Sequence, residues 1–492
     1  PAGVKLSDAL REALGWYLLP CGGRGICGHC KVRVLVNGLS TPTEVERLHN
    51  AVHEYRLACQ ARIEGDTVIE VETYRRRLIT YGVEPRDYDL DPLADGYGLA
   101  FDVGSLKIAA ALVNLRSGRT LEHSYTINPQ ASWGVDVISR ITRVINDPRE
   151  LEEMSRCTID AVHRLGKRLL AKVGRTEPDY VVFTGNSVAL PIMLGIDPSP
   201  LGYSPYENPL REYVCLEARE AGLPWRSEML VLPPIRSFVG SDASTLTVSA
   251  VMHGFTKNAL YIDLGINTEV VYCAAFPKLY VTSAPAGPAI EGGRLSCGTS
   301  ALEGGAEYAR YDPSSGTVRL VPEGERLKGL TGSAIVSLIA SLLEGGVLEP
   351  SGRIVRPSFI REGVRCFSIH DSLVLSQLDV REFQKAKAAV GAACARLFRI
   401  HGRGPGVVIL AGSLGTLVDP RDAERIGLVP TVDLVLQLGN LALVGAKLYM
   451  VSREARNIHR AIYGNYTYVS LLGDKEYEEL WLRHLRLEPF GP

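Results

Sequence analysis

The sequence carries almost no net charge and has no long apolar run. Its 492 residues hold 54 Lys and Arg against 55 Asp and Glu, a formal charge of −1. A surface for nucleic acid or an anionic membrane requires a basic excess, so this balance predicts proteins and small molecules as partners. The most apolar stretch, residues 434–446, is interrupted by Gln437 and Asn440 and is shorter than a membrane-spanning helix. Since no signal peptide is recognised either, the sequence predicts a cytoplasmic protein without a membrane anchor.

Closely spaced cysteine pairs are absent from the chain beyond residue 60. The six cysteines there are far apart and form no C-x-x-C pair, which is typical of thiols in a reducing compartment. No cysteine follows the last of them, so no further cluster motif is expected near residue 492. The six are Cys157, Cys215, Cys273, Cys297, Cys366 and Cys394.

Four cysteines within the first 60 residues are arranged differently. Cys21, Cys27 and Cys30 lie in one glycine-rich loop, and Cys59 follows 29 positions later. Three close cysteines and a distant fourth are typical of the plant-type 2Fe-2S ligand set, although five residues separate the first two here instead of four. The loop glycines permit the turns with which a backbone wraps a cluster. The sequence therefore predicts a 2Fe-2S site on these four thiolates, and a zinc site with four cysteine ligands remains the alternative.

The cluster loop belongs to a first domain that we expect over residues 1–75. Apolar periodicity predicts a helix over 5–15, and alternation predicts strands over 31–37 and 67–73. Residues 76–96 contain two prolines and mixed charges. They are predicted to form a solvated linker to the rest of the chain.

Two later segments resemble each other at an offset of 161 residues, the difference between positions 263 and 102. In each, an apolar strand ends in Asp-x-Gly and a second apolar strand follows, with Asp102 and Gly104 in one and Asp263 and Gly265 in the other. A third strand reaches a glycine turn at 412–415. Glycine turns let backbone N–H groups approach phosphate oxygens, and a nearby carboxylate holds Mg²⁺ directly or through water.

Duplicated hairpins followed by a glycine turn resemble the ATPase fold of actin, Hsp70 and sugar kinases. The resemblance implies an α/β protein whose two similar subdomains, expected over 97–255 and 256–492, face each other across a site for ATP and Mg²⁺. Asp102, Asp263 and Asp242 are the expected catalytic carboxylates, with Glu291 as a weaker candidate. The residues expected at phosphate and nucleoside are Gly104, Ser105, Lys107, Gly265, Asn267, Gly412, Ser413 and Gly415.

A ferredoxin-like domain in front of this ATPase fold narrows the comparison to one family. Over nearly its whole length the chain resembles the reductive activators of corrinoid proteins. The resemblance implies an enzyme that uses ATP to pass one electron from its cluster to the cobalt of a corrinoid partner, restoring Co(I). It also implies an upstream electron donor such as a ferredoxin or a reductase, and it leaves a homodimer open. The matching segments are 128–130, 134–141, 184–186, 194–198, 238–242, 286–292, 379–388, 425–430 and 439–440.

The chain departs from the family pattern in three places. Leu106 and Ile266 stand in the two turns where the family usually has threonine, which predicts altered phosphate binding. The first domain starts at Pro1 without the β-hairpin that normally precedes its first helix, so either the sequence is truncated or the domain has a reduced fold, and a less stable cluster is expected. No cysteine follows Cys394, unlike in relatives with additional C-terminal 4Fe-4S clusters.

Two other functions remain open at this stage. The ATPase fold also serves small-molecule kinases, so the first domain could act as a redox sensor for a kinase. Alternatively, the chain is an electron carrier whose ATPase half has decayed, which the departures at Leu106 and Ile266 favour.

Overall fold

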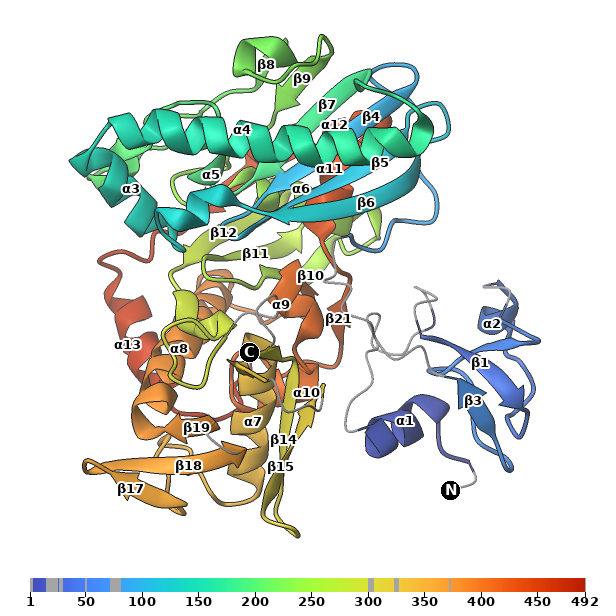
Figure 1. The fold of residues 1–492 in the computed structure, drawn as a ribbon, viewed down its shortest axis with the longest axis vertical. Coiled ribbons are helices and arrows are strands. Elements are labelled where there is room, and N and C mark those ends of the chain that lie inside the picture. The colour runs from blue at the N-terminus through green and yellow to red at the C-terminus, as the bar shows by residue number, and fades with distance from the viewer. Residues whose placement is uncertain are drawn as a thin grey trace.

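The computed structural model describes residues 3–14, 25, 30–48, 51–70, 81–299, 305–322, 327–370 and 373–491. These residues form a small N-terminal domain and two larger α/β lobes (Figure 1). The predicted α/β class is confirmed.

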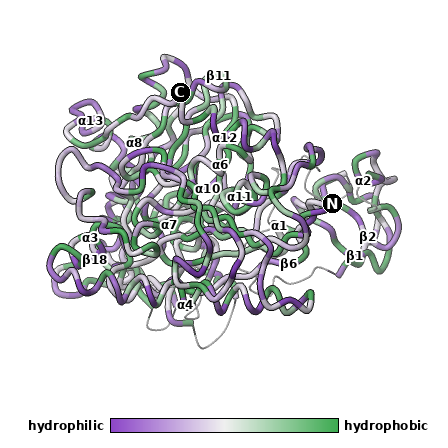
Figure 2. Tube along the Cα trace, turned by 90° about the horizontal axis from the view of Figure 1, so that it is seen from above, coloured by the Kyte–Doolittle hydropathy of each residue, from purple (hydrophilic) through white to green (hydrophobic). Residues whose placement is uncertain are grey.

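The N-terminal domain is built on a three-stranded antiparallel sheet of order β2-β1-β3. Figures 1 and 2 draw it beside the two lobes. The predicted helix and strands are confirmed within the described residues, because apolar side chains at period 3.6 and period 2 bury one face of each element. The elements are α1 (Leu6–Leu14), β1 (Lys31–Val36), α2 (Glu44–Leu48), β2 (Tyr55–Leu57) and β3 (Val68–Glu70).

The first lobe contains a six-stranded sheet of order β6-β5-β4-β7-β9-β8. Strands β4, β5 and β6 form an antiparallel meander, while β7 runs parallel to β4. The core is apolar, with the rings of Phe101 and Phe183 stacked at 4.8 Å. The elements are β4 (Tyr97–Val103), β5 (Lys107–Asn114), β6 (Arg119–Ile127), η1 (Pro129–Ser132), α3 (Val137–Asn146), α4 (Arg149–Leu170), η2 (Ala171–Val173), β7 (Tyr180–Gly185), α5 (Ala189–Met193), η3 (Ser199–Gly202), β8 (Val214–Glu217), η4 (Ala218–Ala221), β9 (Glu228–Val231) and α6 (Ser241–Met252).

The second lobe repeats this plan in a sheet of order β21-β20-β10-β11-β12-β22. Its meander is β10, β11 and β12, and β20 runs parallel to β10. The elements are β10 (Lys257–Asp263), β11 (Thr268–Ala275), β12 (Lys278–Ala284), η5 (Pro288–Glu291), α7 (Gly332–Glu344), α8 (Gln377–His401), β20 (Val407–Ala411), α9 (Gly412–Leu417), α10 (Pro420–Arg425), β21 (Val435–Gln437), α11 (Leu441–Val451), α12 (Arg453–Asn465), β22 (Tyr466–Tyr468) and α13 (Lys475–His484).

Three smaller sheets also belong to the second lobe. One pairs β13 (Gly305–Ala306) with β16 (Gly329–Leu330), and another pairs β14 (Tyr308–Asp312) with β15 (Thr317–Val321). The third contains β17 (Phe359–Arg361), β18 (Val364–His370) and β19 (Leu373–Ser376).

Strand register places the two predicted Asp-x-Gly turns at equivalent positions. In the first lobe Asp102 on β4 is opposite Thr184 on β7, and in the second Asp263 on β10 is opposite Ala411 on β20. The duplicated hairpin predicted from the sequence is therefore confirmed as a structural repeat. Both aspartates lie at the carboxyl end of a strand that has a parallel neighbour, where ligands bind in open α/β sheets.

Helices α6 and α11 pack against each other between the two sheets. Helix α11 contacts β4, β5 and β7 of the first sheet, although it comes from the last quarter of the chain. Helix α6 contacts β10 and β11 of the second sheet. The two halves of the chain are thus joined through a shared pair of buried helices.

Residues 81–91 do not form the solvated linker that was predicted. The backbone N–H of Val83 donates to the carbonyl of Leu438 at 2.8 Å, and the hydroxyl of Tyr88 donates to the carbonyl of Gly118 at 2.9 Å. This segment is therefore fixed to the lobes. Among the described residues, no helix has the length and apolarity needed to cross a membrane.

Candidate functional site

The first Asp-x-Gly turn is held closed by the strand that follows it. The N–H of Gly104 donates to the carbonyl of Lys107 at 2.9 Å. Asn128 donates from its side chain to the carbonyl of Gly104 at 2.7 Å, and from its backbone to that of Leu106 at 2.9 Å. Asn128 therefore shapes the turn that carries Asp102 and Lys107.

The second Asp-x-Gly turn lies against the glycine turn that follows β20. Gly412 has φ +76°, and a Cβ atom there would lie 2.2 Å from Oδ1 of Asp263. Only glycine suits this position, because both the backbone conformation and the close carboxylate exclude a side chain. A Cβ on Gly265 would lie 3.2 Å from Oε1 of Glu291, so that carboxylate also borders the turn.

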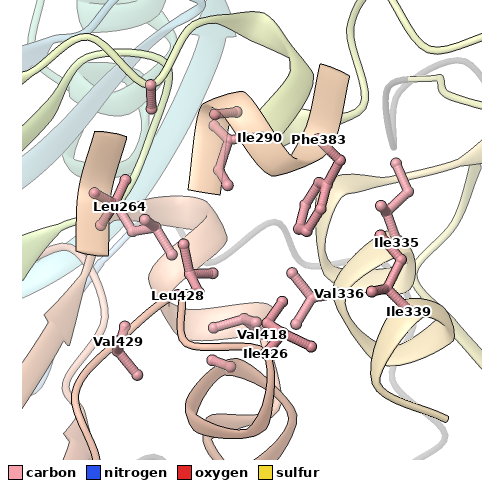
Figure 3. Packing of buried hydrophobic residues seen from close by; sticks show 14 of the residues in the cluster. Leu264, Ile290, Ile335, Val336, Ile339, Phe383, Val418, Ile426, Leu428 and Val429 are labelled. Atoms are coloured by element: carbon pink, nitrogen blue, oxygen red, sulfur yellow. The ribbon is translucent and has the colours of Figure 1, made fainter. Parts of the chain in front are cut away.

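The apolar core of the second lobe anchors the neighbours of these carboxylates. Leu264 directly follows Asp263, and Ile290 directly precedes Glu291. Figure 3 shows both apolar side chains converging on the same core as Phe383. Burial of the adjacent residues therefore fixes where the two carboxylates project.

Two side-chain contacts connect the first hairpin to the second half of the chain. Lys107 donates from Nζ to the hydroxyl of Ser413, and Asn440 donates from Nδ2 to Oδ2 of Asp102 at 2.7 Å. These contacts bring the predicted Asp102, Lys107 and Ser413 together. We call this region, with Asp242 and Asp263, the inter-lobe site.

The carboxyl groups of the inter-lobe site have raised pKa values, because they are buried and because they influence one another. Burial, then the charge of Asp102, raises the pKa of Asp263 to about 7, against 3.8 for an ordinary aspartate. Burial also raises the pKa of Asp102, although Asn440 and Lys107 oppose this. Burial lowers the pKa of Lys107, which faces Asp102, Glu291 and Asp263.

Asp242 lies in the first turn of α6 and is only 7% exposed. Its Oδ1 accepts a hydrogen bond from the N–H of Ala243 at 2.8 Å. Burial, followed by the charges of Asp263 and Asp102, raises its pKa well above the usual value. Asp242, expected from the sequence as a third carboxylate, therefore lies close enough to Asp263 and Asp102 for their charges to affect its pKa.

Glu269 is a buried carboxylate that sequence reasoning missed. It accepts a hydrogen bond from Nδ2 of Asn267, and Asn267 accepts one from the hydroxyl of Ser283 at 3.0 Å. Burial and the charge of Asp242 raise its pKa well above the usual value. A glutamate within an otherwise apolar strand, two residues after the second turn, was the signal that could have identified it.

The remaining predicted phosphate and nucleoside residues make backbone contacts. The carbonyl of Ser105 accepts a hydrogen bond from Arg140. The carbonyl of Gly415 in α9 accepts one from Nε2 of Gln437 at 2.8 Å. Gln437, also missed from the sequence, donates to two more carbonyls, those of Thr416 and Val418, and so fixes the end of the helix that begins at the glycine turn.

The acidic groups of the inter-lobe site do not form a complete metal site by themselves. Within the described ranges, no three His, Cys, Asp or Glu side chains are arranged to hold a metal ion. Mg²⁺ is usually bound through one or two carboxylates together with substrate phosphates. The buried carboxylates and Lys107 therefore fit a magnesium nucleotide better than a bare ion.

The iron-sulfur ligands can be placed only in part. Cys21 and Cys27 lie outside the described residues, whereas Cys30 and Cys59 are 2% and 1% exposed. The N–H of Ala58 donates to the carbonyl of Cys30 at 2.9 Å, which brings the chain at Cys59 next to the start of β1. Gly25, which lies between Cys21 and Cys27 in the sequence, has a left-handed backbone conformation with φ +75°. Two buried thiols and a glycine turn at one end of the sheet fit a 2Fe-2S cluster.

Duplicated α/β lobes with buried carboxylates between them, behind a domain with clustered cysteines, define an ATPase-fold protein with a ferredoxin-type domain. Family models match in the same order. Residues 1–64 match the 2Fe-2S iron-sulfur cluster binding domain, 97–254 the RACo middle region, and 257–490 the C-terminal domain of RACo, the ASKHA domain. The chain therefore belongs to the RACo family.

Relatives with curated names agree with this assignment. The chain is 29% identical over 418 residues to the corrinoid activation enzyme RamQ of Eubacterium limosum, covering 78% of this chain and 69% of that protein. It is 24% identical over 400 residues to the [Co(II) methylated amine-specific corrinoid protein] reductase of Methanosarcina barkeri, covering 73% and 70%.

A solved structure supports the fold over nearly the whole length. It is described as a reductive activator for corrinoid, iron-sulfur protein, and it superimposes with a TM-score of 0.72 at 22% identity. The match covers 99% of this chain and 96% of that one. At this identity the likeness establishes the fold.

Proposed function

We propose that this protein is an ATP-dependent reductive activator, which passes one electron from a 2Fe-2S cluster to the Co(II) centre of a corrinoid protein and restores Co(I). The observation that carries the proposal is the order of the matched regions, since a 2Fe-2S domain, the RACo middle region and the ASKHA domain follow one another in one chain. The names of the two relatives support the same kind of partner.

The inter-lobe site supports nucleotide binding in this scheme. Asp102 and Asp263 would hold Mg²⁺ and orient water, with Asp242 as a third carboxylate nearby. Lys107 and the turn at Gly412 would face the phosphates, where a cation and close backbone N–H groups neutralise charge. We assign this site to subdomains 97–255 and 256–492, the cluster to 1–75, and the connection to 76–96.

Energetics explain why electron transfer would need ATP. A bound plant-type 2Fe-2S cluster supplies single electrons near roughly −400 mV. Reduction of Co(II) needs a lower potential, and each 100 mV costs one electron about 2.3 kcal/mol. ATP can offset this cost only if it stabilises one state of the complex more than another. Because the site draws residues from both lobes, nucleotide binding would favour the state in which the lobes are engaged. An upstream ferredoxin or reductase would replace the electron.

The test mixes the anaerobically reduced full chain with a corrinoid protein in the Co(II) state and follows Co(I) by its absorption spectrum. Co(I) is expected in the presence of Mg-ATP and not in its absence. Asp102→Asn should lower partner-stimulated hydrolysis by on the order of a hundredfold, the scale of one lost electrostatic contact in an active site.

Two results would reject the proposal. Formation of Co(I) at the same rate without nucleotide would mean that ATP does not drive the electron. ATP turnover stimulated by a sugar and not by the corrinoid protein would point to a kinase with a redox-sensing domain.

A further inference from the structure

Residues 81–91, which we call the connecting segment, lie against the loop that carries Asn440. The carbonyl of Leu438 accepts a hydrogen bond from Val83 at 2.8 Å. A Cβ on Gly82 would lie 2.7 Å from that same carbonyl and 2.9 Å from the carbonyl of Asn440. A Cβ on Gly439, at φ +79°, would lie 2.6 Å from the carbonyl of Tyr81. The two backbones therefore touch without room for a side chain on either.

A buried lysine fastens the connecting segment to the helix that follows this loop. Lys447 on α11 is 0% exposed. Its Nζ lies 2.7 Å from Oε2 of Glu84 and 4.6 Å from the ring centroid of Tyr88. The other oxygen of Glu84 accepts hydrogen bonds from Tyr81 and Thr120, each at 2.6 Å. Breaking a buried pair of this kind leaves an uncompensated charge, so the attachment is strongly specified.

The same loop leads directly to the inter-lobe site. Asn440 is the N-cap of α11, where its Oδ1 accepts a hydrogen bond from the N–H of Leu443 at 2.9 Å. Its Nδ2 donates to Asp102 at 2.7 Å. One side chain therefore links the start of α11 to a predicted catalytic carboxylate, and the connecting segment packs on its backbone.

We infer that the connecting segment positions Asn440, and through it Asp102, for nucleotide hydrolysis. This inference rests on the proposed function, because it assigns a positioning role within the same site. The segment is continuous in sequence with the iron-sulfur domain. The connecting segment therefore joins that domain, along the chain, to the loop that contacts Asp102.

The main test compares two carboxylates of the connecting segment. Glu84→Gln removes the charge that faces Lys447, next to the loop of Asn440. Asp91→Asn is the matched control, since Asp91 pairs with Arg456 at 2.6 Å and Arg453 at 2.9 Å, both on α12. Glu84→Gln should lower kcat for Mg-ATP hydrolysis by the full chain about tenfold or more, with little change in KM, because misplacement of a catalytic group acts mainly on turnover. Asp91→Asn should leave both constants near those of the wild type.

A double variant separates positioning from a general loss of structure. If Glu84 acts through Asn440, Glu84→Gln should lower kcat no further in a chain that already carries Asn440→Ala. If the fold-decreases in kcat caused by Glu84→Gln and by Asn440→Ala multiply in the double variant, the two residues act independently and the inference is overturned.

A second variant applies if Glu84→Gln does not fold. Gly82→Ala places a methyl group against the carbonyls of Leu438 and Asn440 without changing charge, and it should also lower kcat. Gly464→Ala on α12 is its control, since a Cβ there meets nothing within 4 Å. Unchanged kcat in Gly82→Ala would overturn the inference. If the wild-type chain hydrolyses no nucleotide at all, the proposed function fails first and this inference falls with it.

Discussion

Asn440 donates a hydrogen bond of 2.7 Å to Asp102, a residue 338 positions earlier in the chain. The bond opposes the effect of burial on the pKa of Asp102. It also makes the first turn of α11 part of the inter-lobe site. The side-chain amide of Asn440 therefore has two roles: its oxygen caps α11, and its nitrogen donates to the candidate catalytic carboxylate of Asp102.

Asn440→Asp should separate these two roles. Aspartate caps a helix as well as asparagine does, so the start of α11 should be preserved. The new carboxylate would face Asp102 directly, and two adjacent carboxylates tend to share one proton. We expect nucleotide hydrolysis to fall about tenfold or more near neutral pH. Equal hydrolysis in the variant and the wild type would mean that the amide of Asn440 is not needed.

Asp263 should make nucleotide binding release a proton. Its folded-state pKa of about 7 lies above the ordinary 3.8, so between these pH values the folded chain holds a proton that the unfolded chain has lost. The favourable contribution of Asp263 to the free energy of unfolding is fully present below about pH 4 and is lost as the pH rises through about 7. Mg²⁺ favours the charged carboxylate, so Mg-nucleotide binding near pH 6 should expel the proton.

Calorimetry in two buffers of different ionisation enthalpy measures this proton release. Asp263→Asn should abolish most of it, whereas Asp197→Asn, at an exposed position, should not. The same release in Asp263→Asn and in the wild type would contradict the assignment.

Gly412→Ala should weaken nucleotide binding more than its backbone strain explains. Gly402 has nearly the same conformation, φ +77°, but a Cβ there meets nothing within 4 Å. Gly402→Ala therefore measures the strain alone, on the order of 1–3 kcal/mol of unfolding free energy. Gly412→Ala adds a clash with Asp263 and should lose further stability and most of its nucleotide affinity. Thermal melts with and without Mg-ATP compare the two variants.

Cys30→Ser should remove the iron-sulfur signal and leave the nucleotide site intact. A serine oxygen is a poorer ligand for iron than a thiolate, so the reduced protein should lose the spin-½ EPR signal of a 2Fe-2S centre. Stabilisation by Mg-ATP should persist, because Cys30 lies in another domain. Cys157→Ser on α4 serves as the control and should keep both signals. One zinc per chain and no iron after anaerobic reconstitution of the wild type would instead favour the zinc alternative.

The repeated hairpins could be predicted because their signal is local. Asp102 and Asp263 each end an apolar strand and precede a glycine, and the strand register places them at equivalent positions. Their catalytic roles, and those of the predicted phosphate-binding residues, stay predictions.

Partners distant in sequence could not be predicted. The prolines and charges between 76 and 96 are typical of a solvated linker. The contact that shows otherwise joins Glu84 to Lys447, 363 residues away, and no local pattern indicates it. The contact of Asn440 with Asp102 has no local signature either. Glu269 was not predicted as a site residue, because a single buried acid in an apolar strand gives no repeating pattern.

Because the connecting segment is anchored to the lobes, fewer residues separate the iron-sulfur domain from them than the predicted linker would provide. Ten residues, 71–80, lie between the end of β3 at Glu70 and the first anchored residue, Tyr81. Even a fully extended chain of that length spans at most about 36 Å. Chain length alone therefore keeps the end of β3 near Tyr81. A corrinoid partner that takes an electron from this cluster would therefore have to dock close to the lobes.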